Sequence, residues 1–107
     1  MIHMMRTSEA DSAVARLWQE HLSAAFPGTL RGAELAGVDM VMLDADVAGC
    51  VSTWRNNRGT LDSERRRILH DCITDLDKVL PLLTSKEDLR YYQRLRQLAV
   101  LVSETGS

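Results

Sequence analysis

Five arginines around one predicted turn are the residues of this chain that most resemble a binding site. They flank Gly59 and continue into a predicted helix: Arg55, Arg58, Arg65, Arg66 and Arg67. The beginning of a helix attracts anions because its first N–H groups are unpaired and the helix dipole is positive there. A phosphate, a nucleic-acid backbone or an acidic protein surface would relieve the mutual repulsion of these guanidinium groups. The cluster therefore predicts anion or partner binding as one interpretation.

The same arginines also fit an ordinary solvated surface. Residues four apart are neighbours on a helix, so Asp62 would pair with Arg66, and Arg67 with Asp71. The segment further suggests a helix-turn-helix, in which Ser63, Arg66 and Arg67 would face a DNA groove. The formal net charge is only -2 and no basic arm flanks the segment, so a nucleic-acid partner is disfavoured.

Three aspartates are close enough in the sequence to suggest a cation site. Asp44 and Asp46 form a D-x-D pair, and Asp39 lies a little upstream. Carboxylates are hard oxygen ligands that suit divalent cations. No calcium-binding loop and no phosphate-binding loop follows, so we expect one of these aspartates to cap a helix and predict no metal site.

Histidine and cysteine are too sparsely placed to predict a zinc site. The relevant side chains are His21, Cys50, His70 and Cys72, and no C-x-x-C pair occurs. His70 and Cys72 are two apart on a predicted helix and point to different sides of it. We expect two buried thiols, a half-buried histidine at His21, and no cofactor.

Catalytic patterns are likewise missing from the sequence. It has no serine nucleophile elbow, no H-E-x-x-H and no Walker or dinucleotide-binding pattern, so we expect a non-enzyme with no catalytic residues. An enzyme would need two or more of four side chains to converge in a pocket: His21, Asp44, Asp46 and His70.

Length and composition set the scale of the fold. The chain has 107 residues, of which 45% are hydrophobic and 26% charged, which is typical of one soluble globular domain. It has no apolar run long enough for a membrane span and no secretory leader pattern, so we expect no membrane partner and a cytoplasmic location. Residues 1–107 are predicted to form a single helical domain, with flexible ends at 1–7 and 103–107.

Two helices are expected in the first half of the chain. The first begins near Ser8, where Ser8 and Asp11 resemble a capping box, and it ends before Pro27. Residues 28–37 read as a glycine-rich connection. Residues 38–43 alternate like a strand, but we expect a helix from Val38 or Leu43 to Asn56, because a strand there would find a partner only across a dimer axis.

The second half predicts an antiparallel helical hairpin. One helix begins at Thr60 or Asp62 and ends or kinks near Leu80, because Pro81 follows. The other begins with the capping pair Ser85 and Asp88. A turn centred between them would put Asp77 level with Arg90. The expected fold class is all-α, a small three- or four-helix bundle with this C-terminal hairpin.

The last helix carries more apolar surface than one neighbour would cover. A second apolar edge contains Tyr91, Leu95, Leu98 and Val102. Either this helix is central and buried by its own chain, or the edge is a dimer surface. From it we expect a small intracellular non-enzymatic interaction or regulatory module that forms a homodimer, with an acidic protein as another partner. The alternative is nucleic-acid or anion binding through the cluster from Arg55 to Arg67.

Overall fold

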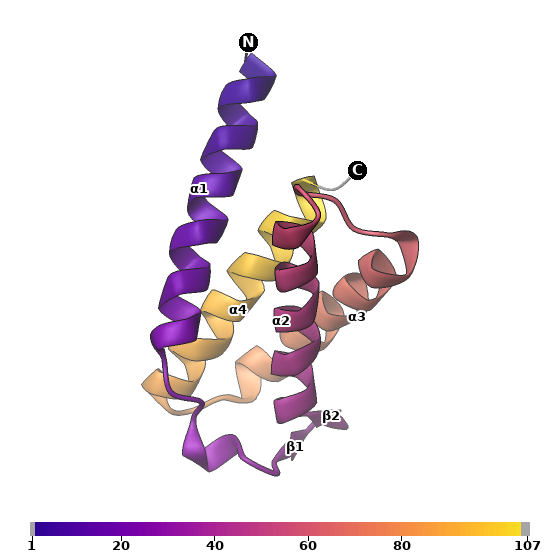
Figure 1. The fold of residues 1–107 in the computed structure, drawn as a ribbon. Helices are drawn as coiled ribbons and strands as arrows, with labels where there is room; N and C mark the ends of the chain where they lie inside the picture. Colours follow the sequence, from indigo (N-terminus) through magenta and orange to yellow (C-terminus); the bar gives the residue numbers. More distant parts are fainter. Residues whose placement is uncertain (1, 106–107) are drawn as a thin grey trace.

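Four helices pack around one another in the computed structural model, which describes the backbone of residues 2–105 and the side chains of residues 9–105 (Figure 1). The elements in chain order are α1 (Ile2–Ser23), the 3-10 turn η1 (Gly28–Leu30), β1 (Glu34–Leu35), β2 (Val38–Asp39), α2 (Met40–Asn56), α3 (Ser63–Val79), the 3-10 turn η2 (Leu80–Leu82) and α4 (Lys86–Thr105). The prediction of an all-α bundle with a C-terminal helical hairpin is confirmed.

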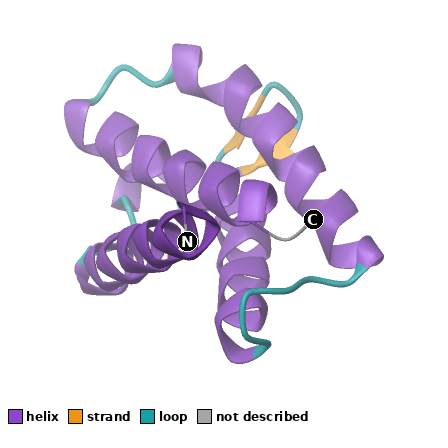
Figure 2. Cartoon of the chain, turned by 90° about the horizontal axis from the view of Figure 1, so that it is seen from above, coloured by secondary structure: helices purple, strands orange, loops and turns teal. Residues whose placement is uncertain are grey.

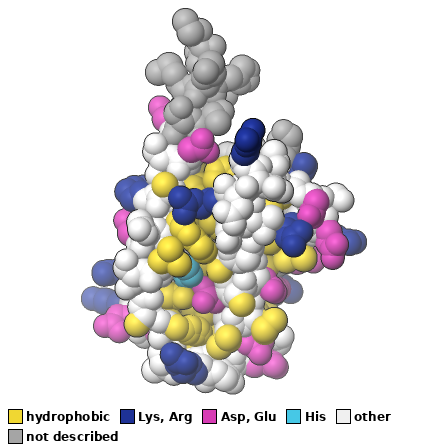
Figure 3. All heavy atoms as spheres, in the orientation of Figure 1, with side chains coloured by type: hydrophobic (Ala, Val, Ile, Leu, Met, Phe, Trp, Pro, Cys, Tyr) yellow, Lys and Arg dark blue, Asp and Glu magenta, His cyan; other side chains and the backbone are white. Residues whose placement is uncertain are grey.

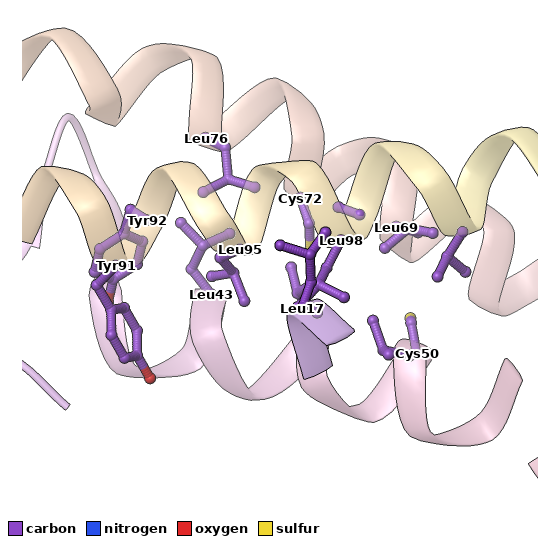
Figure 4. Packing of buried hydrophobic residues seen from close by; sticks show 14 of the residues in the cluster. Leu17, Leu43, Cys50, Leu69, Cys72, Leu76, Tyr91, Tyr92, Leu95 and Leu98 are labelled. Atoms are coloured by element: carbon purple, nitrogen blue, oxygen red, sulfur yellow. The ribbon is translucent and has the colours of Figure 1, made fainter. Parts of the chain in front are cut away.

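Helix α4 lies at the centre of the bundle. It contacts α1, α2 and α3, whereas α1 packs mainly on α4 and extends past the other helices at its N-terminal end (Figure 1). Side chains from all four helices meet along α4 (Figure 4), and those labelled there are Leu17, Leu43, Cys50, Leu69, Cys72, Leu76, Tyr91, Tyr92, Leu95 and Leu98. The described helices include none that is both long and apolar enough to cross a bilayer.

The central position of α4 corrects the expected dimer surface. Tyr91 is only 5% exposed, and Leu95, Leu98 and Val102 are fully buried. A helix covered by three neighbours needs an apolar stripe wider than a surface helix does. These four residues are therefore core residues of the single chain and are not available to a second copy.

Side-chain caps define the helix starts that the sequence predicted. Asp62 Oδ1 accepts from the Arg65 N–H at 2.8 Å, and Ser85 Oγ accepts from the Asp88 N–H at 3.4 Å. Asp39 Oδ1 accepts from the Met42 N–H at 3.1 Å, so one of the three upstream aspartates does cap a helix. Each cap satisfies an N–H group that has no partner inside its helix.

The outer ends of the first and last helices differ from the prediction. Helix α1 begins at Ile2, so Ser8 and Asp11 lie inside it and not at its start. No glycine or proline precedes Ser8, and nothing in that stretch stops a helix. Helix α4 continues to Thr105, past the expected end at Val102.

A short hairpin replaces the predicted start of the second helix. Leu35 pairs with Val38 and Glu34 with Asp39 in antiparallel register (orange in Figure 2). Ala36 and Gly37 have φ of 51° and 77°, and a two-residue hairpin turn of the type with both central φ values positive is well suited to this twist. The expectation that a strand here would lack a partner in its own chain is wrong, because the glycine-rich connection supplies one.

Candidate anion-binding site

The five arginines that the sequence singled out lie on the outside of the bundle. Arg55 ends α2, Arg58 lies in the following loop, and the remaining three occupy the first turns of α3; all are exposed. Arg65 pairs with Asp62, with an N–O distance of 2.6 Å, and Arg66 Nε donates to the Leu61 carbonyl at 3.3 Å.

The helix pairs expected for these arginines are not formed. Asp62 binds Arg65 instead of Arg66, because the cap already brings Arg65 to it, and no Arg67–Asp71 pair occurs among the described side chains. None of the five arginines lines the hollows described below. The cluster is therefore an exposed surface that forms no part of either hollow.

A better-formed basic site lies along α4. A hollow of about 500 Å³ opens between α4, the end of α1 and η2, and it is lined by Glu20, Leu80, Arg90, Gln93, Arg94, Arg96 and Gln97. Four of these residues lie on one face of α4, because each is three or four positions from two other members of the set. We call this set the α4 polar stripe: Arg90, Gln93, Arg94 and Gln97.

Of the four charged side chains that line this hollow, two form ion pairs and two do not. Arg96 Nε donates to Asp77 Oδ1 at 2.8 Å, and Glu20 lies 3.5 Å from Arg16. Arg90 and Arg94 form no ion pair with any described side chain. Like charges four apart on a helix destabilise it by about 0.2–0.5 kcal/mol, so this pair opposes the stability of α4 when no anion is present.

The Asp77–Arg96 pair also corrects the expected hairpin register. The sequence placed Asp77 level with Arg90, but the connection does not turn midway between the two helices. Leu80–Leu82 adds a 3-10 turn to the end of α3, and Leu83 then takes an extended conformation. Arg90 is left without the carboxylate that a symmetric hairpin would have given it.

The guanidinium group of Arg94 is held in place by an aromatic ring. It lies 5.6 Å from the centroid of Tyr91, within the range of a favourable cation–π contact. Its Nε is buried and has no hydrogen-bond partner among the described atoms. Arg94 is therefore a positioned cation, and no described atom accepts a hydrogen bond from its Nε.

A hydrogen bond to Asp44 in turn holds Tyr91 in place. The Tyr91 hydroxyl donates to Asp44 Oδ2 at 3.0 Å, linking α4 to α2. Burial, and after it the negative charge of Asp44, raises the pKa of Tyr91 above its usual value, so the hydroxyl stays protonated and remains a donor.

A second, smaller hollow adjoins the first one. It has a volume of about 210 Å³ and is lined by Ala24, Ala25, Pro27, Glu87, Arg90, Tyr91 and Arg94. Arg90 and Arg94 line both hollows, so they stand on the boundary between a polar space and a more apolar one.

His21 and Asp44 are the two of the four proposed enzyme side chains that meet. His21 Nε2 lies 3.0 Å from Asp44 Oδ1, and the His21 ring stacks on Trp18 with centroids 5.9 Å apart. In Figure 3 a histidine side chain shows between α1 and α2, with an acidic side chain beside it. His21 and Asp44 line neither hollow, and they tie α1 to α2.

The remaining soft and hard ligands are dispersed. His70 and Asp46 are exposed on α3 and α2, and no group of three metal-ligating side chains occurs among the described residues. Cys50 and Cys72 are buried free thiols, as expected. Burial, with smaller contributions from nearby charges, raises the pKa of Cys72 to about 12.

The α4 polar stripe is not among the sites expected from the sequence. The sequence does contain a signal for it: two arginines and two glutamines recur with helical spacing, and Glu87 is the only acid three or four positions from any of them. The symmetric hairpin expected from the sequence puts Arg90 level with Asp77, so the sequence does not show that Arg90 lacks this partner.

Comparison with known proteins adds no relative, since the chain matches no protein-family model, no curated protein and no solved structure.

Proposed function

We propose that this protein is a small non-enzymatic binding module that recognises an anionic group at the α4 polar stripe. The observation that carries the proposal is the pair Arg90 and Arg94, which share the edge of two hollows and have no carboxylate partner among the described side chains. Guanidinium groups suit carboxylate and phosphate because they present several donors in one plane.

The neighbouring residues support the same function. Gln93 and Gln97 add neutral amide groups that can donate to further oxygens of the ligand, and Gln97 lies about 10 Å along the helix from Arg90. Arg94 is already oriented by Tyr91, so binding would order less side chain than a free surface arginine requires. The stripe is thus a more specific recognition surface than the exposed cluster from Arg55 to Arg67.

Self-association and a cytoplasmic location stay predictions from the sequence. The residues that suggested a homodimer, Tyr91, Leu95, Leu98 and Val102, are buried within one chain. The proposal therefore assigns the interaction surface to the polar side of α4 and not to its apolar side.

Thermal unfolding with inorganic phosphate tests the proposed function. Phosphate is compared with chloride at equal ionic strength, because phosphate also stabilises proteins by exclusion from their surface. At tenfold over its Kd, a ligand of the folded state adds about 1.4 kcal/mol, which raises Tm by roughly 6 °C for a domain of about 100 residues.

Two double variants separate the site from general charge effects. We expect Arg90→Gln with Arg94→Gln to lose the phosphate-specific rise in Tm, and Arg55→Gln with Arg67→Gln to keep it. Both variants lose the same charge, so an equal response in the two would contradict the proposal, as would a wild-type Tm that phosphate and chloride affect alike.

A further inference from the structure

We infer that the ligand of this site is a small organic anion in which a phosphate or carboxylate is joined to a planar apolar group. This inference rests on the proposed function. The acidic group would lie against Arg90 and Arg94 on the side of the larger hollow, and the apolar group would occupy the smaller hollow beyond them.

The two hollows are arranged for a ligand of two parts. Arg90 and Arg94 line both, so a group bound to their guanidinium nitrogens is adjacent to each space. The larger hollow continues along α4 past Gln93 and Gln97, and the smaller one opens in the other direction, towards the chain segment that follows α1.

The walls of the smaller hollow are mainly apolar. Ala24, Ala25 and Pro27 have no polar side-chain atoms, and short side chains at these positions leave the space open. Tyr91 also lines this space, but with a small part of its surface, because it is only 5% exposed and Arg94 lies over its ring. Phe26 holds that ring from another side, edge to face, with centroids 5.6 Å apart. A flat apolar group would contact the small apolar side chains and the exposed part of Tyr91, whose position these contacts fix.

Charge decides which part of the ligand enters which hollow. Besides the shared arginines, the larger hollow has Arg96 and Glu20, and the smaller one has Glu87 and no further cation. Glu87 would repel an anion placed deep in the smaller hollow. The acidic group is therefore favoured on the larger side, where the glutamine amides can reach its oxygens.

Size favours a small molecule over an acidic protein segment. The smaller hollow, about 210 Å³, suits a single ring system, and the two hollows together have the scale of a small-ligand site. An acidic peptide would use the arginines but would gain nothing from the apolar walls at Ala24 and Pro27.

The test compares three probes by isothermal titration calorimetry: phenyl phosphate, methyl phosphate and a short polyglutamate peptide. Phenyl and methyl phosphate carry the same charge and differ only in the apolar group. We expect phenyl phosphate to bind at least about tenfold more tightly than methyl phosphate, because the free energy gained by burying an aromatic ring is large enough for that change in affinity. Polyglutamate is expected to bind more weakly than phenyl phosphate.

Filling the smaller hollow provides the second arm of the test. Ala25→Trp should reduce the preference for phenyl over methyl phosphate at least about fivefold, and Ala45→Trp, at an exposed position of α2, should keep it. Equal affinities for the two phosphates, an unchanged preference in Ala25→Trp, or tighter binding of polyglutamate would overturn this inference.

The outcomes also distinguish the two proposals. If methyl phosphate binds through Arg90 and Arg94 and the phenyl group adds nothing, the inference about the ligand fails and the proposed function stands. If none of the three probes binds the wild-type protein, both fail.

Discussion

The guanidinium group of Arg94 lies over the ring of Tyr91, and the hydroxyl of the same tyrosine donates a hydrogen bond to Asp44. One side chain therefore connects a surface cation to the interior of the bundle. His21 extends the connection to α1, because its Nε2 lies 3.0 Å from the other oxygen of Asp44. The position of Arg94 is a consequence of how three helices meet.

Tyr91→Phe tests the interior part of this connection. The variant leaves Asp44 Oδ2 without its donor in a partly buried position, so we expect a loss of about 1–3 kcal/mol in the free energy of unfolding, measured with urea. Tyr91→Leu removes the ring as well, and it should weaken phosphate binding more than Tyr91→Phe does. Unchanged stability in Tyr91→Phe would show that the hydrogen bond contributes nothing.

Arg90→Gln tests whether the stripe opposes stability in the absence of a ligand. Removing one of two like charges four residues apart should raise the free energy of unfolding by about 0.2–0.5 kcal/mol at low salt, and the gain should shrink as salt screens the charges. Arg96→Gln is the matched control, because Arg96 is paired with Asp77 and should show no gain. A destabilised Arg90→Gln variant would mean that this arginine has a structural role.

Leu98→Ala tests the assignment of α4 to the core. Leu98 is fully buried, so its truncation should cost about 2–5 kcal/mol in the free energy of unfolding. Val41→Ala, at an exposed position of α2, should cost far less. Sedimentation should give the same oligomeric state for wild-type and folded Leu98→Ala protein, and a variant that dissociates a dimer would restore the surface that the structure excludes.

Burial of thiol and phenol groups predicts a loss of stability in alkali. The folded state raises the pKa of Cys72 from 9.0 to about 12, so the thiol keeps its proton in the folded state and loses it in the unfolded state. The contribution of the Cys72 thiol to the free energy of unfolding is therefore fully present below about pH 9, and it is lost progressively as pH rises towards about 12. The raised pKa values of Tyr91 and Tyr92, both from burial, act in the same direction above about pH 10.

Urea unfolding as a function of pH checks this expectation. The midpoint should be flat around neutral pH and should fall above about pH 9, and Cys72→Ala should fall less steeply because it has one titrating group fewer. A midpoint that does not change up to about pH 12, or an identical slope in Cys72→Ala, would contradict the burial of this thiol.

The helical period of the sequence was enough to predict the architecture. Apolar residues spaced three and four apart identified all four helices, and short polar side chains identified the caps at Asp62 and Ser85. The hairpin was missed because its first strand, Glu34–Leu35, has only two residues and shows no alternation, so the alternating residues 38–43 had no recognisable partner in the sequence. Its turn also uses Ala36 at positive φ, where the sequence offers no glycine as a signal.

The site could not be derived in the same way. Periodicity shows how much of α4 is apolar, but it does not show which elements cover it, and so Leu95 and Leu98 fitted a dimer surface as well as a core. The partner of Asp77 depends on how the chain turns between α3 and α4, and a 3-10 turn at Leu80–Leu82 changes that geometry. Only the folded chain shows that Arg90 and Arg94 have no ion-pair partner among the described side chains.

The most direct measurement of the central claim is a titration of the protein with inorganic phosphate, followed by the arginine Nε–H signals in ¹H–¹⁵N correlation spectra at low salt. The account predicts that the signals of Arg90 and Arg94 shift along one saturable curve, while those of Arg55 and Arg67 change little. Signals that move together at all four arginines, or first at Arg55 and Arg67, would contradict it.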